Sequence, residues 1–452
     1  MKTQKYKLNC LLLTVLIGIA FTSCKKYLDA KPQLQLSTIT SVADLQALLD
    51  NTSVMNQVDP NLGLISSDDY YDTYTNYLSQ TLNIRNLYIW DPNEIDDCWS
   101  FPYEAVYAAN IVLDNITNVA STASVSEVSN VKGQALFFRG YQFYWLSQCY
   151  APPLTSANQN TQLGICLRLT SSITTPSVRS TVQQTYDQII SDLTTAAQLL
   201  PVTSAYPTTP TKAAAYGALA RTYLVMGDYK DAENAASSCL SLQGTLMNYN
   251  TLNPSAKYPF KLFNNECIFY GNYNAAVHNT SYVDSTLIKS YSSNDLRSVL
   301  FFAKNSNGTS YFKGDYSGND YGYPEYDGIT VDEMYLIKAE CEAREGNINN
   351  AAMNDLNTLL VTRWATGTFV PYTATSATDA LNQILTERRK ELVFRNLRWS
   401  DLRRLNLDPN YAITLTRNLN GTIYTLPPND LRYTFLIPAS VISLTGIQQN
   451  PR

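Results

Sequence analysis

The sequence predicts a mostly α-helical fold in which helical hairpins alternate with long irregular segments. Residues 211–242 read TKAAAYGALARTYLVMGDYKDAENAASSCLSL, and their apolar side chains recur at helical spacing on both sides of Gly227. Residues 331–363 show the same arrangement around Gly346. Because alanine-faced helices joined at a glycine can approach closely, we expect each of these stretches to form a helical hairpin.

The spacing within residues 211–242 resembles a tetratricopeptide repeat, whose period is roughly 34 residues. A lone repeat cannot bury its own apolar face, so the chain must supply more of them. We expect about four such hairpins, near residues 99–150, 181–242, 331–363 and 378–405. Insertions near residues 60–98 and 243–330 are expected to form an irregular half with little β-structure.

The single elements follow from local signals. Helices are expected over residues 41–51, 99–116, 133–150, 181–200 and 379–405. Thr211 is a plausible N-cap, and Pro201 ends the helix before it. A strand is expected over residues 267–270. Residues 66–92 are expected to be loop with short helical turns, and the tail from Thr422 is expected to be extended.

The N-terminus predicts export. Lys2, Lys5 and Lys7 precede an apolar run that is too short to span a bilayer. The run ends just before Cys24, which resembles a bacterial lipoprotein signal in which this cysteine is lipidated. We therefore expect a signal peptide over residues 1–23, a tether over 24–40 and a single body over 41–452. The alternative is a plain signal peptide with an incidental cysteine.

Composition limits the class of ligand. Removing residues 1–23 deletes three lysines and no acids, which takes the net charge from −5 to −8. That balance excludes a general nucleic-acid surface. Tyrosine is abundant, with 33 residues, while only 16% of residues are charged. Such a surface suits neutral polar ligands, and it is also found in secreted proteins that bind nothing small.

Cysteine spacing predicts no metal centre. The residues that remain after Cys10 and Cys24 fit no zinc pattern. Cys239 and Cys341 lie on apolar helix faces and are expected to be buried thiols; a disulfide among the others stays open. Residues 314–320 offer oxygen ligands for calcium but lack the EF-hand spacing. No other cofactor is expected.

Several motifs resemble the SusD/RagB family of surface lipoproteins, which partner SusC-like TonB-dependent transporters in glycan uptake. The most specific is ERRKELVFRNLRWSDLRRL at residues 387–405, which departs from the family pattern at Arg395-Asn396, where Glu-Gly is usual. The other matches are Cys24 with KKYLD, Trp99-x-x-x-Tyr103, Ala109-Asn110, Pro152-Pro153-Leu154, YLIKAE at 335–340 with Gly346, Leu356-Asn357, Ile437-Pro438 and Gln449-Asn450-Pro451.

The resemblance implies a SusD-like fold that is anchored at the outer membrane and faces the cell exterior. In the family the repeat side packs on the transporter barrel, and the protein acts as a lid without catalytic activity. Arg398 and Asp401 would then be buried pairing residues and not an acid/base dyad. Trp145 and Trp399, which lie on helices, are assigned to the core.

The sequence contains no convincing set of catalytic residues. The one histidine, His278, lies in a polar loop, so no Ser-His-Asp or His-metal site can be assembled. The carboxylate pairs Asp68-Asp69 and Asp96-Asp97 would suit a glycoside hydrolase, but adjacent acids on a loop are usually solvated. We expect no catalytic residues.

Glycan capture needs aromatic faces with nearby polar groups, and the two insertions contain both. The candidate ligand residues are Asn83, Arg85, Tyr88 and Trp90 in the first insertion and Tyr273, Tyr282, Asp315 and Tyr321 in the second. Trp90 is the strongest candidate because it lies in a polar stretch, although a tryptophan beside Asp91-Pro92 can also be a packing residue. The leading hypothesis is a glycan-capturing lid. The alternatives are a peptide-capturing lid with the same partner and a hydrolase.

Overall fold

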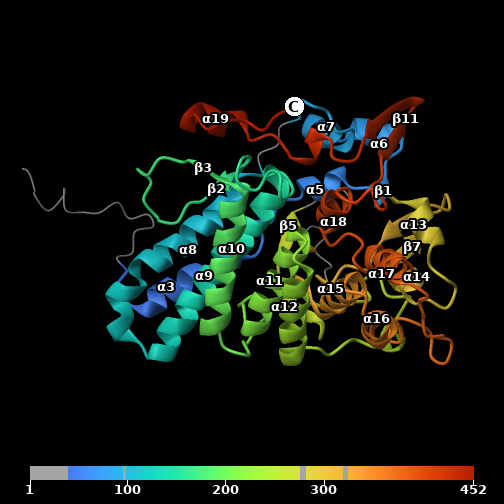
Figure 1. Cartoon of the computed structure of the whole chain (residues 1–452), viewed down its shortest axis with the longest axis horizontal. Helices are drawn as coiled ribbons and strands as arrows, with labels where there is room; N and C mark the ends of the chain where they lie inside the picture. Colours follow the sequence, from blue (N-terminus) through green and yellow to red (C-terminus); the bar gives the residue numbers. More distant parts are fainter. Residues whose placement is uncertain (1–38, 95–97, 275–280, 319–323) are drawn as a thin grey trace, which may run out of the picture. The chain divides into compact units, whose positions relative to one another are not determined.

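A row of helices forms one side of the fold. The computed structural model describes residues 39–94, 98–274, 281–318 and 324–452. Successive helices pack against one another, from α8 to α12 and then onto α15 and α17 (Figure 1). They are α8 (Ser100–Val119), α9 (Val125–Tyr150), α10 (Val182–Leu199), α11 (Lys212–Met226), α12 (Tyr229–Leu242), α15 (Val331–Arg344), α16 (Met353–Leu360) and α17 (Ala377–Glu391). A π-helical turn (Ile348–Ala352) precedes α16.

The hairpin of α11 and α12 forms as its sequence predicts. The Thr211 side chain accepts a hydrogen bond from the Ala214 amide and so caps α11. Gly227 ends the helix with a left-handed φ of 77°, which glycine adopts without steric cost. At Gly217 a Cβ atom would lie 2.5 Å from the Ile329 side chain, so glycine lets this neighbour approach closely.

The predicted helix over residues 379–405 is interrupted, which corrects the expectation of one helical region. Helix α17 ends at Glu391, and α18 (Arg398–Leu405) begins after a six-residue break. Within the break Phe394 and Asn396 both have φ near 59°. The left-handed region stops a helix, and asparagine tolerates it better than most residues. Asn396 therefore fills the position where glycine is usual.

The irregular half consists of short helices and two-stranded antiparallel ribbons. The strand pairs are β1 (Tyr70–Tyr71) with β6 (Tyr282–Val283), β2 (Leu163–Cys166) with β3 (Arg179–Thr181), β4 (Cys267–Phe269) with β10 (Ile329–Thr330), β5 (Asn272–Asn274) with β9 (Pro324–Tyr326), β7 (Phe302–Lys304) with β8 (Ser310–Phe312), and β11 (Leu415–Leu419) with β12 (Thr422–Leu426). The prediction of a mostly α-helical fold is confirmed, as is the strand near residue 267.

Short helices complete the described chain. They are α3 (Val42–Leu49), α4 (Thr52–Met55), α5 (Leu62–Ser66), α6 (Tyr74–Ser79), α7 (Leu82–Tyr88), α13 (Ser285–Lys289), α14 (Arg297–Leu300) and α19 (Ala439–Thr445). The extended tail is thus interrupted by α19, which follows Pro438 and ends at Gly446 in the left-handed region. Within the described ranges, no helix combines the length and apolar character that crossing a bilayer requires.

The interior contains the side chains that the sequence assigns to it. Trp145 and Trp399 are buried. Cys239 and Cys341 are buried free thiols, as predicted. Burial raises the pKa of both thiols well above the usual value, so they stay protonated.

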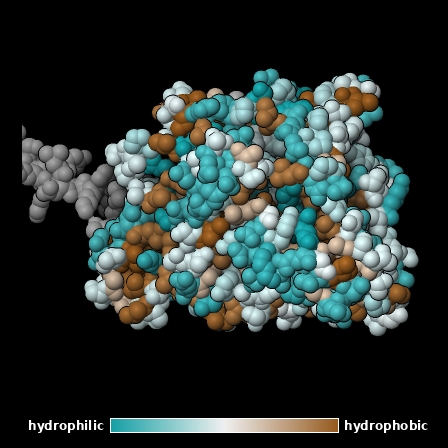
Figure 2. Space-filling view, viewed as in Figure 1, coloured by the Kyte–Doolittle hydropathy of each residue, from teal (hydrophilic) through white to brown (hydrophobic). Residues whose placement is uncertain are grey.

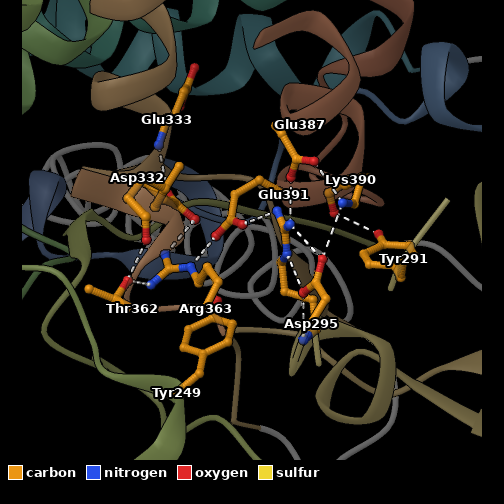
Figure 3. A network of polar contacts seen from close by, with 12 residues as sticks. Tyr249, Tyr291, Asp295, Asp332, Glu333, Thr362, Arg363, Glu387, Lys390 and Glu391 are labelled. Carbon is orange, nitrogen blue, oxygen red and sulfur yellow. Dashed lines mark hydrogen bonds and ion pairs between the residues drawn. The ribbon is translucent and has the colours of Figure 1, made fainter. Parts of the chain in front are cut away.

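A buried ionic network joins the helical side to the irregular half (Figure 3). At its centre, one carboxylate oxygen of Glu391 accepts from Arg363 Nε at 2.7 Å, and the other accepts from Arg297 Nη1 at 2.8 Å. Arg363 also donates to both oxygens of Glu266 at 2.9 Å, and Arg297 donates to Asp295 at 2.7 Å. Five side chains from four separate parts of the chain thus meet at one point.

Each of the cations Arg297, Arg363 and Lys390 pairs with at least one carboxylate of this network. Burial alone would raise the pKa of Glu391, but Arg363 and Arg297 lower it below the usual value. Lys390 Nζ pairs with Glu387 at 2.7 Å. Asp332 lies beside the network, and burial, followed by the charge of Glu266, raises its pKa to about 7. Because every buried ion has an opposite charge beside it, the network can exist without water.

Glu391→Gln should destabilise the fold strongly. The amide NH₂ of glutamine would face a guanidinium donor and leave one arginine without its carboxylate. Removing one partner of a buried ion pair costs about 3–5 kcal/mol of unfolding free energy, which urea denaturation measures. Lys230→Ala, which breaks the exposed Lys230–Glu233 pair, is the control and should leave the midpoint nearly unchanged. Equal midpoints for the two variants would contradict this role of the network.

Candidate ligand-binding face

Helix α6 presents an aromatic stripe to solvent. Tyr74, Tyr77 and Leu78 lie on one side of this helix, a spacing that is typical of a face packed against the core. Even so, none of the six residues of α6 is buried. Tyr74 is 45% exposed and Leu78 48% exposed, and the Tyr74 and Tyr77 rings stack with centroids 6.4 Å apart. Over α6, α7 and β11, Figure 2 shows hydrophobic side chains scattered among hydrophilic ones. The Tyr77 ring also packs 6.0 Å from the buried Tyr88 ring, so Tyr74 and Leu78 are the most exposed part of the stripe and are available to a ligand.

Polar groups from two other elements border the stripe. From α7, the Arg85 guanidinium lies 5.8 Å from the centre of the Tyr77 ring. The pKa of Tyr77 is raised by burial and then by the nearby Tyr424 of β12, which places that tyrosine beside it. We call Tyr74, Tyr77, Arg85 and Tyr424 the aromatic face. It combines rings with a cation and several hydroxyls.

Arg417 of β11 supports this face from below. Its buried guanidinium donates to three backbone carbonyls, those of Ser67, Tyr70 and Tyr88, with 2.7 Å to Tyr70. The guanidinium also lies over the rings of Tyr70, Tyr88 and Trp90, at 5.3, 4.2 and 5.2 Å from their centres. One arginine therefore fixes the segment from which α6 and α7 project.

The structure corrects the expectation that Trp90 is an exposed platform. Trp90 is only 3% exposed, and its indole Nε1 donates to the Ser66 carbonyl at 2.9 Å. Tyr88 is likewise buried, with its hydroxyl accepting from the Asp72 amide. Both rings pack around Arg417, so they support the surface and cannot contact a ligand in this conformation. Of the predicted residues in this insertion, Asn83 is exposed and Arg85 belongs to the aromatic face.

The second insertion contributes one candidate beside the first. Tyr282 pairs with Tyr71 across the β1–β6 ribbon, and the two rings lie 5.6 Å apart. Tyr273, a predicted ligand residue, is fully buried and donates from its hydroxyl to Glu325 and the Phe394 carbonyl, so it cannot contact a ligand in this conformation. Asp315 accepts from the backbone amides of Ser317 and Tyr326.

Some predictions fall outside the described residues. These are Tyr321, His278, the pair Asp96-Asp97, Cys24 and the last two residues of the 314–320 loop. Among the described residues, no group of three His, Cys, Asp or Glu side chains could hold a metal ion. A calcium role for the loop stays a prediction.

A second aromatic surface lies between α8 and α19. It forms a cavity of about 290 Å³ lined by Trp99, Tyr103, Tyr107 and Leu444, among others. Its polar side chains are used within the fold: the Tyr103 hydroxyl donates to the Cys166 carbonyl, and Asn110 donates to the Arg168 carbonyl. The surface therefore offers fewer free polar groups than the aromatic face.

Two family descriptions match the chain. Residues 26–224 match a family described as starch-binding and associating with the outer membrane, and residues 265–435 match the SusD family. The chain belongs to the SusD/RagB family. A search of curated proteins finds no match.

Solved structures from Bacteroides share the SusD fold of this chain. A SusD superfamily protein from Bacteroides thetaiotaomicron VPI-5482 is 22% identical, with a TM-score of 0.72, over 91% of this chain and 100% of that one. A putative sugar binding protein from Bacteroides vulgatus ATCC 8482 is 21% identical, with a TM-score of 0.73, over 92% and 99%. A SusD-like carbohydrate binding protein from the same organism is 19% identical, with a TM-score of 0.70, over 90% and 97%.

The SusD signature segment has a structural role here. Asp401 accepts from Arg388 and Arg404 at 2.9 Å, as expected for a buried pairing residue. Arg398 pairs with Asp68 at 2.7 Å, and Asp69 pairs with Arg389. The expectation that Asp68-Asp69 is a solvated pair is therefore wrong. Neutralised by arginines, these carboxylates anchor the first insertion to α17 and α18.

Sequence analysis missed Tyr74, Tyr77 and Tyr424. A signal for the first two was present, because an aromatic pair at i and i+3 followed by Leu78 is a helical stripe inside a polar segment. Tyr424 had no local signal. It reaches the aromatic face only because the C-terminal ribbon folds back over the first insertion.

Arg417→Lys should loosen the segment under the aromatic face. A lysine ammonium cannot reproduce the planar fork, so at least one buried carbonyl loses its donor, at a cost of about 1–3 kcal/mol. We expect a lower urea midpoint and faster proteolysis within residues 66–94. Arg168→Lys, whose guanidinium donates to the Ser172 and Thr175 carbonyls away from this segment, is the control. Unchanged proteolysis in the Arg417 variant would show that this arginine does not hold the segment.

Proposed function

We propose that the chain is a non-catalytic surface lipoprotein that captures an oligosaccharide on its aromatic face. The Tyr74–Tyr77 stripe of α6 carries the proposal, because no residue of this helix is buried and Tyr74 and Leu78 are 45% and 48% exposed. Sugar rings present C–H faces that pack on tyrosine, while their hydroxyls need hydrogen-bond partners. Arg85 and the tyrosine hydroxyls can supply those partners at the same place.

Family membership supports the same class of ligand. One matching family is described as starch-binding, and two structural neighbours are described as sugar- or carbohydrate-binding proteins. We further propose that lipidated Cys24 anchors the protein at the outer membrane, facing the exterior, and that it acts as a lid for a SusC-like TonB-dependent transporter. This part rests on the family resemblance and on the signal at residues 1–24.

Calorimetric titration tests the proposal. Protein beginning after Cys24 is titrated with a panel of oligosaccharides and peptides, and the same samples are assayed for released reducing ends and new amines. Saturable heat with a glycan and no product supports capture without catalysis. Heat with peptides alone would favour a peptide-capturing lid, and product formation would overturn the non-catalytic assignment.

Tyr74→Ala and Tyr77→Ala should each weaken glycan binding. Losing an aromatic contact costs about 0.5–1.5 kcal/mol, which corresponds to roughly a two- to tenfold rise in Kd. Tyr74 is 45% exposed, so its variant should fold normally, whereas the Tyr77 ring packs on Tyr88, so the fold of that variant is checked by urea denaturation. Tyr206→Ala is the matched control, since Tyr206 is 62% exposed in a different loop. Unchanged glycan affinity in both α6 variants would contradict the site assignment but not the family assignment.

A further inference from the structure

Two aspartates meet in the interior at the bases of the two irregular segments. Asp59 lies just before α5, where the first segment begins, and Asp327 lies just after β9, where the second ends. Both are buried, and their side chains interact directly with each other. The pair therefore joins parts of the chain that are far apart in sequence.

Each carboxyl group has one satisfied oxygen and one free oxygen. Gln142 Nε2 donates to Asp59 Oδ1 at 2.7 Å, and Asn396 Nδ2 donates to Asp327 Oδ2 at 3.1 Å. The other oxygens, Asp59 Oδ2 and Asp327 Oδ1, make no hydrogen bond of standard geometry within the described residues, although the Tyr141 hydroxyl lies close enough to lower the pKa of Asp59. Both free oxygens border Gly271, where a Cβ atom would lie 3.1 and 3.3 Å from them. A proton held between these two oxygens would satisfy both.

Among the described residues, Arg221 is the cation that acts on the pair, and its charge lowers the pKa of both carboxyls without cancelling the effect of burial. Its Nε and Nη2 already donate to Glu333 at 2.9 and 2.7 Å. The titratable and charged groups around the pair are Tyr141 of α9, Arg221 of α11, Glu333 of α15, and Tyr270 and Tyr273 at β4 and β5. Two buried carboxylates without a counter-ion would repel each other strongly.

We propose that Asp59 and Asp327 share a proton and form a pH-sensitive latch that holds the bases of the two irregular segments together. Asn396 closes the same junction, because its Nδ2 also donates to the Pro60 carbonyl at 2.9 Å. Loss of the shared proton places two like charges side by side, and the junction opens locally. The link from this latch to ligand capture rests on the proposed function.

The direction of the pH effect follows from proton linkage. Burial raises the pKa of Asp59 to about 7, and burial together with Asp59 raises the pKa of Asp327 well above its usual value. Above pH ~4 the unfolded chain has lost protons that the folded chain keeps. Stability contributed by the pair is therefore full at low pH and is lost as the pH rises through about 7 and beyond.

Hydrogen exchange without any glycan tests the latch. Peptides covering residues 56–66 and 268–274 are compared at pH 6 and pH 9, after correction for the intrinsic exchange rate. We expect wild-type protection to fall by about tenfold or more at pH 9, since a shift of one pKa unit is already a tenfold change in the linked equilibrium. Asp59→Asn keeps the hydrogen-bonding shape and carries no charge, so its protection should stay the same at both pH values.

Asp332→Asn is the matched control. Asp332 is also buried with a raised pKa, but it lies beside the ionic network on α15. Its variant should lose protection at pH 9 as the wild type does. Wild-type protection that does not change with pH, or a pH-dependent loss that persists in Asp59→Asn, would overturn the latch. If Asp59→Asn fails to fold, Asp327→Asn takes its place, and its protection should likewise stay the same at pH 6 and pH 9 while that of the wild type falls.

Glycan affinity is then measured separately at both pH values. Affinity that falls at pH 9 in the wild type but not in Asp59→Asn would connect the latch to the aromatic face. Because the exchange experiment contains no ligand, it can support the latch even if no glycan binds. A failure of the proposed function therefore remains distinguishable from a failure of the latch.

Discussion

The carboxylate of Glu391 sits between Arg297 and Arg363, and the irregular half depends on this buried contact. Short ribbons and four- to eight-residue helices cannot stabilise themselves, because each buries little apolar surface. The network gives them an attachment to α17, with Glu266 and Asp295 bringing in the segments before β4 and α14. Removing any one ion would leave its neighbours as buried charges without a counter-ion, so the whole cluster acts as a unit.

The same principle recurs nearer the surface with arginine bound to backbone carbonyls. Arg417 donates to the backbone carbonyls of Ser67, Tyr70 and Tyr88, and its guanidinium packs against three rings. Asp68 and Asp69 tie this segment to α17 and α18. A helix such as α6, which buries nothing, can then remain ordered and keep its tyrosines exposed. Rigid support of this kind lowers the entropic cost of binding, because the side chains that contact the ligand are already ordered.

Local pattern predicted the helical side, whereas long-range contacts decided the candidate site. The α11–α12 hairpin follows from apolar spacing and Gly227, which are properties of neighbouring residues. Trp90 could not be placed in this way, because its burial depends on Arg417 and Ser66 rather than on its polar neighbours. The break in the signature segment depends on the left-handed backbone of Phe394 and Asn396. The sequence hinted at the second of these positions, because Asn396 stands where the family pattern usually has glycine.

A crystal structure with a bound oligosaccharide tests the central claim most directly, namely that a rigidly supported aromatic face captures the ligand. The glycan used is the one that gives saturable heat. The account predicts sugar rings packed on Tyr74 and Tyr77, with Arg85 bonded to their hydroxyls and with Trp90 still buried beneath. A sugar bound in the cavity between α8 and α19, without contact to α6, would contradict it.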